Sequence, residues 1–140
     1  MSKKIVLGLV VAVLLGVVAI QAQAPAPSGI KRTVLLKEDI APMPAMTAYV
    51  AEGELAPGVE SGWHTHPGHD FTYIRSGEGI LEVEGKQPQT LKAGVAIHNL
   101  PGVVHNVRNP SNTEPLKYSS VYIIEQGKPV AAPAPAPAKK

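Results

Sequence analysis

Short runs of apolar residues, or of alternating apolar and polar residues, fill the middle of the chain, with Gly and Pro recurring between them. We expect strands at residues 33–36, 47–55, 71–75, 80–84, 89–91, 95–99, 105–108 and 116–125. No part of this region sustains a 3.6-residue apolar period, so no helix is expected there. Short strands at regular spacing, bounded by turn residues, predict an all-β sandwich or barrel.

The first 24 residues have the layout of a secretory signal peptide. Lys3 and Lys4 precede an uncharged apolar run over residues 5–20, and Ala22 and Ala24 provide a small-residue cleavage signal. A membrane-spanning helix needs about 20 apolar residues, which favours cleavage over a retained anchor. Because Pro25 is unfavourable directly after a cleavage point, cleavage after Ala22 and retention as an anchor are the alternatives. We expect an exported protein, periplasmic or secreted, without membrane association once the signal is cleaved.

The rest of the chain divides into three parts. Residues 25–29 form a Pro-containing linker, and residues 30–128 form one domain of a common size. Residues 129–140 are mostly Ala and Pro, which favour polyproline II and lack the apolar bulk to pack. We therefore predict a disordered Ala-Pro tail after a single folded domain.

Charge and cysteine content exclude some functions. Loss of Lys3 and Lys4 with the signal peptide leaves 11 basic and 11 acidic residues. A nearly neutral chain without a basic stripe is not expected to bind nucleic acid. The chain has no cysteine, so a metal site would use nitrogen and oxygen ligands.

The histidines are concentrated in one stretch, because all five lie between His64 and His105. His64 and His66 are two residues apart, so on a strand both side chains leave the same face. Asp70 adds a carboxylate after a Pro-Gly turn signal. Two histidines with a carboxylate are typical of open-sided iron sites, whereas three histidines also suit zinc or copper. The pattern predicts a metal site, with a polar strand edge as the alternative.

Two spaced motifs in this region resemble the two signatures of the cupin superfamily. Together they span residues 58–109, which is 52 of the 140 residues. The first consists of Gly58, His64, His66, Asp70 and Gly77, and the second of Gly94, Pro101, Gly102, His105 and Asn109. The chain departs from the family pattern twice, with Asp70 in place of the usual glutamate and Leu100 in place of the usual proline.

The resemblance implies a small, exported, single-domain type-2 cupin with a jelly-roll β-barrel. It further implies one divalent transition metal in the barrel, held by His64, His66, Asp70 and His105, with iron, manganese, zinc, nickel and copper all open. Aspartate is one methylene shorter than glutamate, so the alternative role of Asp70 is to orient a histidine. His69 is the alternative ligand if the Pro-Gly turn shifts the strand register.

Three functions follow from the resemblance. The first is a metal-dependent enzyme, either a dioxygenase-like oxidoreductase or an isomerase, acting on a small organic substrate. The second is a non-catalytic module that binds a small molecule or a metal ion. The third is a barrel that works through its surface or as a homodimer paired through edge strands.

A few residues outside the motif ligands are assigned roles. His98 is the candidate for proton transfer in the cavity, and its alternative is a hydrogen-bonded histidine in or near the core. The aromatic residues Trp63, Phe71 and Tyr73 are expected to pack in the barrel wall.

Overall fold

The computed structural model describes residues 29–40 and 43–138, and within these ranges the chain forms strands and no helix. The strands are β1 (Ile30–Asp39), β2 (Met46–Leu55), β3 (His64–Thr65), β4 (Gly68–Ser76), β5 (Glu78–Val83), β6 (Gln89–Lys92), β7 (Ala96–Asn99), β8 (His105–Arg108), β9 (Leu116–Glu125) and β10 (Ala132–Pro133).

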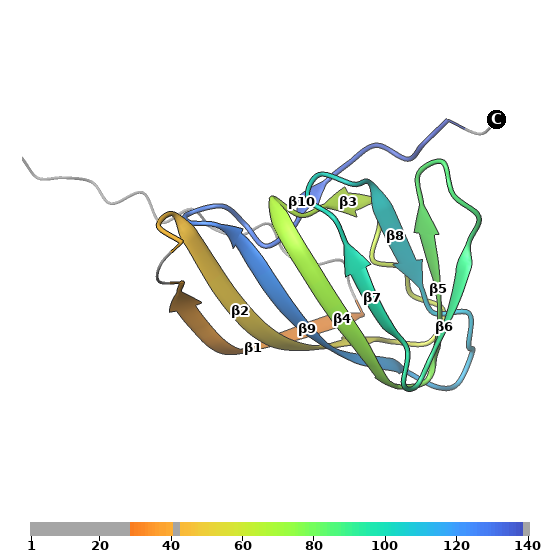
Figure 1. Ribbon diagram of the computed structural model, residues 1–140. Helices are drawn as coiled ribbons and strands as arrows, with labels where there is room; N and C mark the ends of the chain where they lie inside the picture. Colours follow the sequence, from red (N-terminus) through yellow and green to blue (C-terminus); the bar gives the residue numbers. More distant parts are fainter. Residues whose placement is uncertain (1–28, 41–42, 139–140) are drawn as a thin grey trace, which may run out of the picture.

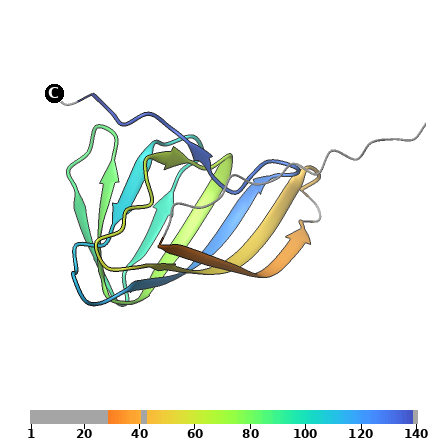
Figure 2. The same ribbon diagram turned by 180° about the vertical axis from the view of Figure 1, so that it is seen from behind.

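The strands form two antiparallel sheets that make opposite walls of a barrel (Figure 1). The sheet with the longer strands, here called the larger sheet, has the order β1-β2-β9-β4-β7, and the smaller sheet has the order β10-β3-β8-β5-β6. Figure 2 shows from behind that β1 and β2 lie at the edge of the larger sheet, away from β5 and β6. The predicted all-β jelly-roll barrel is confirmed.

Strand β4 shows how the sequence pattern directs side chains into the barrel. Asp70, Thr72 and Ile74 are buried, and Phe71 and Tyr73 between them are exposed. This alternation follows from the two-residue period of a strand. The inner face of β4 therefore carries polar groups as well as an apolar one, which is unusual for a pure packing surface.

Two apolar clusters pack the interior. The larger cluster contains Leu55, Ile74, Leu81, Leu91 and Leu116, and all of these side chains are at most 5% exposed. The smaller cluster contains Ala51, Tyr122, Ile124 and Val130. Full burial of one such aliphatic side chain contributes about 1.5–3 kcal/mol, so these clusters account for much of the fold's stability.

The start of the C-terminal tail is ordered, and the prediction of disorder from residue 129 is wrong for this part. Val130 is 5% exposed and belongs to the smaller apolar cluster. Strand β10 pairs with β3, and the amide of Ala134 donates to the carbonyl of Trp63 at 2.9 Å. Pro133 is tolerated because β10 is an edge strand, where a missing N–H costs little.

Two of the predicted wall aromatics lie outside the barrel. Phe71 and Tyr73 are 42% and 50% exposed on the outer face of β4, because the buried positions of this strand are the even-numbered ones. Trp63 is half-buried and lines the interior cavity.

The predicted signal peptide, residues 1–24, lies outside the described residues, as do residues 25–28 of the linker. Over the described ranges, the chain contains no helix with the length and apolar character needed to cross a membrane.

Candidate metal centre

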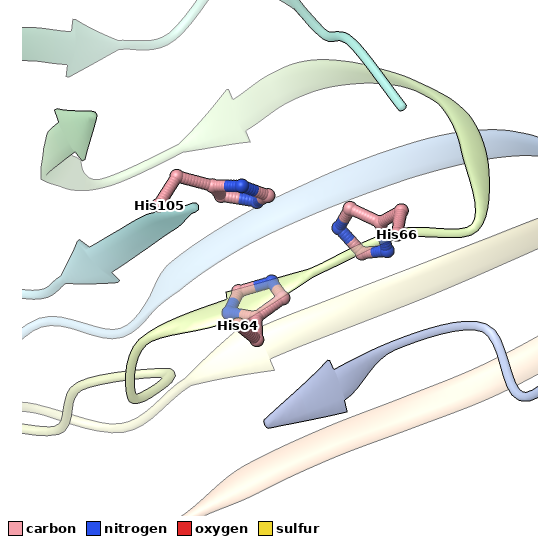
Figure 3. Close-up of side chains that lie close together, drawn as sticks. All are labelled: His64, His66 and His105. Carbon is pink, nitrogen blue, oxygen red and sulfur yellow. The ribbon is translucent and has the colours of Figure 1, made fainter. Parts of the chain in front are cut away.

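Three histidines converge inside the barrel (Figure 3). His64 on β3 pairs directly with His105 on β8, and their ring centroids are 4.3 Å apart. His66 follows β3, with its ring centroid 4.9 Å from that of His64 and 5.1 Å from that of His105. One ring nitrogen from each histidine lies within 4.8 Å of the others. The structure therefore brings together three of the four predicted ligands.

The loop between β7 and β8 places His105 opposite the first motif. Gly102, with a φ of 72°, closes a turn in which the amide of Val103 donates to the carbonyl of Leu100 at 3.2 Å. The Gly102 amide also donates to the carbonyl of His66 at 3.0 Å. A φ in this range favours glycine, so the turn is kept although the motif proline is displaced by one position.

Backbone carbonyls determine the tautomer of all three rings. The Nδ1 atoms of His64, His66 and His105 lie 2.8, 2.6 and 2.9 Å from the carbonyl oxygens of Gly62, Val130 and Val103. A carbonyl oxygen only accepts a hydrogen bond, so each Nδ1 carries the proton and donates it. Each Nε2 therefore keeps its lone pair, which is the form of histidine that binds metals.

Burial keeps two of these rings neutral. Burial, together with the neighbouring His105 ring, lowers the pKa of His64 to about 4, although the hydrogen bond to Gly62 acts in the opposite direction. Burial likewise lowers the pKa of His66 to about 4, against the hydrogen bond to Val130. At neutral pH both rings are therefore neutral, with Nε2 free to bind a cation.

Asp70 lies beside this cluster on β4. Its Oδ2 is 3.5 Å from Nε2 of His66, and its two oxygens accept hydrogen bonds from Thr72 Oγ1 and Asn99 Nδ2, each at 2.8 Å. With the His66 proton on Nδ1, the Nε2 lone pair faces a carboxylate. A cation placed between these two groups would attract both, so the donor set fits a metal. Ligation by Asp70 itself stays a prediction.

The other two histidines point away from the cavity. His69 and His98 lie on the outer face of the larger sheet, with Nδ1 of His69 2.9 Å from Nε2 of His98. The Phe71 ring stacks on His98 at a centroid distance of 4.2 Å. The strand alternation that directs Asp70 and Asn99 inward turns these rings outward, so the structure brings neither His69 nor the proton-transfer candidate His98 to the site.

A cavity of about 710 Å³ lies between the two sheets and contains the histidine cluster. Its polar lining includes residues that sequence reasoning did not assign: Arg32, Thr72, Asn99, Tyr118 and Tyr122. The two tyrosines were visible only as strand formers. The alternation of β9 directs both tyrosines inward. Arg32 is brought to the cavity by the pairing of β1 with β2, which a single sequence does not give.

The family assignment follows from sequence comparison. The profile of the family described as the cupin domain matches residues 49–122, which is more than half of the chain. The chain belongs to the cupin family.

Three known proteins show how far the similarity extends. The β-alanine degradation protein BauB of Pseudomonas aeruginosa is 41% identical over 68 residues, covering 46% of this chain and 70% of that protein. The oryzines biosynthesis cluster protein J of Aspergillus oryzae is 40% identical over 75 residues, covering 53% of this chain but only 40% of that protein's length. A conserved protein from Klebsiella pneumoniae with a double-stranded β-helix domain superposes with a TM-score of 0.64 at 26% identity, covering 80% of this chain and 90% of that one.

Proposed function

We propose that the barrel binds one divalent transition metal through Nε2 of His64, His66 and His105 and uses it on a small organic molecule in the cavity. The observation that carries this proposal is the set of three Nδ1-to-carbonyl hydrogen bonds. Rings held only by packing would not need one common tautomer, whereas a metal needs three lone pairs pointing at one place.

The remaining groups support a metal with vacant positions. Three protein ligands leave at least one position for another ligand, as in catalytic sites. Asp70 is the proposed fourth donor, oriented by Thr72 and Asn99. When bound, the metal supplies Lewis-acid or redox chemistry at this position. The apolar side chains of Leu55 and Leu116 line the same cavity and exclude water from part of it.

An enzyme is favoured over a binding module. The cavity volume of about 710 Å³ suits a small organic ligand. The similarity to a protein named for β-alanine degradation supports a catabolic role. The reaction we propose is that of a metal-dependent oxidoreductase or isomerase, and it rests on the histidine cluster. A different observation supports the non-catalytic alternative. Among the described residues, the histidines that line the cavity are the three of the cluster, so no further histidine is present there to act as a base. A reaction here would therefore depend on the metal rather than on a separate histidine base.

Metal content tests the proposal. The protein is purified without chelator or nickel resin and its metals are measured by elemental analysis. The His64→Ala/His105→Ala variant removes two ligands, and the matched His69→Ala/His98→Ala variant removes two histidines from the outer face. We expect close to one metal per chain in the parent and the outer-face variant, and loss of metal in the first variant. A folded parent without bound metal, or equal metal in all three proteins, contradicts the proposal.

The identity of the metal separates the functions. Iron or manganese supports the dioxygenase-like reaction, which an oxygen-consumption screen of small organic acids and amines then tests. Zinc or copper supports three-histidine ligation and favours isomerisation or binding.

We also propose that the protein is exported, on the basis of the charged, apolar and small-residue regions of residues 1–24. Mass spectrometry of the protein from a periplasmic fraction should give a new N-terminus after Ala22 or Ala24. An intact Met1 in a cytoplasmic fraction contradicts export.

A further inference from the structure

Arg32 extends into the cavity from the edge strand β1. Arg32 pairs with Gly53 on β2, and Gly53 pairs with Tyr118 on β9, so the three residues form one row across the larger sheet. A Cβ at Gly53 would overlap the Tyr118 ring. The absence of a side chain in the middle of the row lets the Tyr118 ring lie over the backbone, next to the Arg32 guanidinium.

The guanidinium is only partly satisfied by its surroundings. Its Cζ lies 5.7 Å from the centroid of the Tyr122 ring, a cation–π distance. The Nε of Arg32 is buried and has no hydrogen-bond partner among the described residues. Leaving a buried donor of a charged group unpaired is more unfavourable than leaving a neutral one unpaired. Arg32 lines the cavity, so its guanidinium is in a position to bind a ligand there.

The charges around the cavity favour an anion. Among the described residues that line it, Lys31 and Arg32 are cationic and Asp70 is the one carboxylate. Burial raises the pKa of both Tyr118 and Tyr122, so these phenols stay neutral. A metal on the three histidines would add further positive charge. A small molecule carrying a negative group is therefore the complementary occupant.

We propose that Arg32 binds the carboxylate of the molecule that occupies the cavity, so that the ligand is a small organic acid. The planar guanidinium presents paired N–H donors that match a carboxylate. Tyr122 connects this position to the histidines, because its ring is 5.7 Å from Arg32 Cζ and 5.2 Å from the His66 ring. An acid bound at Arg32 would therefore occupy the same cavity as the three histidines. Any contact of that acid with a metal rests on the proposed function, whereas the carboxylate contact with Arg32 needs no metal.

Trp63 gives a direct readout of binding. It is the single tryptophan of the chain and lines the cavity, so a ligand entering the cavity changes its fluorescence. Metal-free full-length protein is titrated with propionate and, separately, with propionamide, which has nearly the same shape without the charge. We expect saturable binding of propionate that is at least tenfold tighter than that of propionamide. Equal binding of the two compounds, or no saturable signal with either, overturns the proposal.

Variants then identify the residue responsible. Arg32→Met removes the guanidinium and keeps the length of the side chain, and should weaken propionate binding at least tenfold. Arg32→Lys keeps the charge but loses the fork of donors, and should give an intermediate affinity. Arg75→Met is the matched control, because Arg75 is exposed and pairs with Glu52 at 3.0 Å on the outer face. Parent-like binding by Arg32→Met overturns the proposal. If that variant does not fold, the comparison of propionate with propionamide on the parent still decides.

The metal content of the same variants separates this inference from the proposed function. Arg32→Met should retain the metal of the parent, because all three histidines are intact. A parent that binds propionate but no metal refutes the proposed function and leaves the carboxylate site standing. A parent that binds metal but does not distinguish propionate from propionamide refutes the carboxylate site alone.

Discussion

Nδ1 of His66 donates to the carbonyl oxygen of Val130 at 2.6 Å, which connects two residues 64 positions apart in the chain. Val130 itself is buried against Ile124 and Tyr122. The C-terminal segment thus anchors in the apolar interior and determines, through one backbone carbonyl, which nitrogen of a proposed metal ligand is free.

Truncation should therefore impair the metal site. A chain ending at Lys128 lacks Val130, so His66 loses its acceptor and the interior loses an apolar side chain. We expect metal affinity to fall about 10–100-fold and the free energy of unfolding to fall by about 1.5–3 kcal/mol. A chain ending at Pro135 keeps β10 and serves as the control. Metal competition titrations and urea unfolding measure both effects, and equal results for the two truncations contradict this role of the tail.

The metal-free protein should lose stability on mild acidification. The pKa of His64 and of His66 is about 4 in the folded protein, below the ordinary value of 6.5. Below pH 6.5 the unfolded chain therefore binds protons that the folded chain does not, and stability falls until the pH reaches about 4. The loss is on the order of 2 kcal/mol per histidine at pH 5. Urea unfolding at pH 7 and pH 5 measures it, and a His64→Gln/His66→Gln variant should show a flatter dependence. The same slope in both proteins would rule out these histidines as the cause.

Replacement of Asp70 should weaken metal binding without removing it. Asp70→Asn removes the charge beside His66 and places an amide donor against either Thr72 or Asn99, while the three histidines remain. We expect an affinity about 10–100-fold lower, whether the carboxylate binds the metal or orients a ligand. Glu78→Gln, which removes an exposed carboxylate paired with Lys92, is the charge-matched control. Unchanged affinity in Asp70→Asn would exclude Asp70 from the site.

Asn109 should be needed for folding rather than for chemistry. Its buried Nδ2 donates to the carbonyls of Leu55, Ala56 and Glu114 at 3.1, 3.2 and 2.8 Å. Asn109→Asp turns this donor into an anion facing three carbonyl oxygens, which should cost at least about 3 kcal/mol of stability. Asn112→Asp makes the same change at an exposed position of the same loop and should cost little. Similar unfolding midpoints for the two variants would contradict this interpretation.

Much of the fold was accessible from the sequence because local patterns determine it. The alternation around Phe71 and the strand formers near Tyr122 predicted strands that the structure contains. Gly102 closes its turn because a φ of 72° favours glycine. Such features depend on residues that are close in the chain, so a single sequence is enough to read them.

The remaining part of the site depends on long-range pairing. Arg32 reaches the cavity because β1 pairs with β2 in a particular register, and His66 is oriented by a carbonyl near the end of the chain. The Ala-Pro composition after residue 129 predicted disorder, and the single valine that anchors this segment carries no recognisable local signal. Register and anchoring are tertiary properties, which explains why Arg32 and Val130 were not assigned.

The two sheets of the barrel contribute different groups of residues to the cavity. His64 and His105 come from the smaller sheet, whereas Arg32, Tyr118 and Tyr122 come from the larger one. Substitutions at inward positions of β1 and β2, which lie apart from His64 and His105, should therefore change the choice of the proposed small molecule with little effect on these imidazoles. For a protein engineer, a library of substitutions confined to inward positions of β1 and β2 would vary the lining of the cavity and leave the three histidines unchanged.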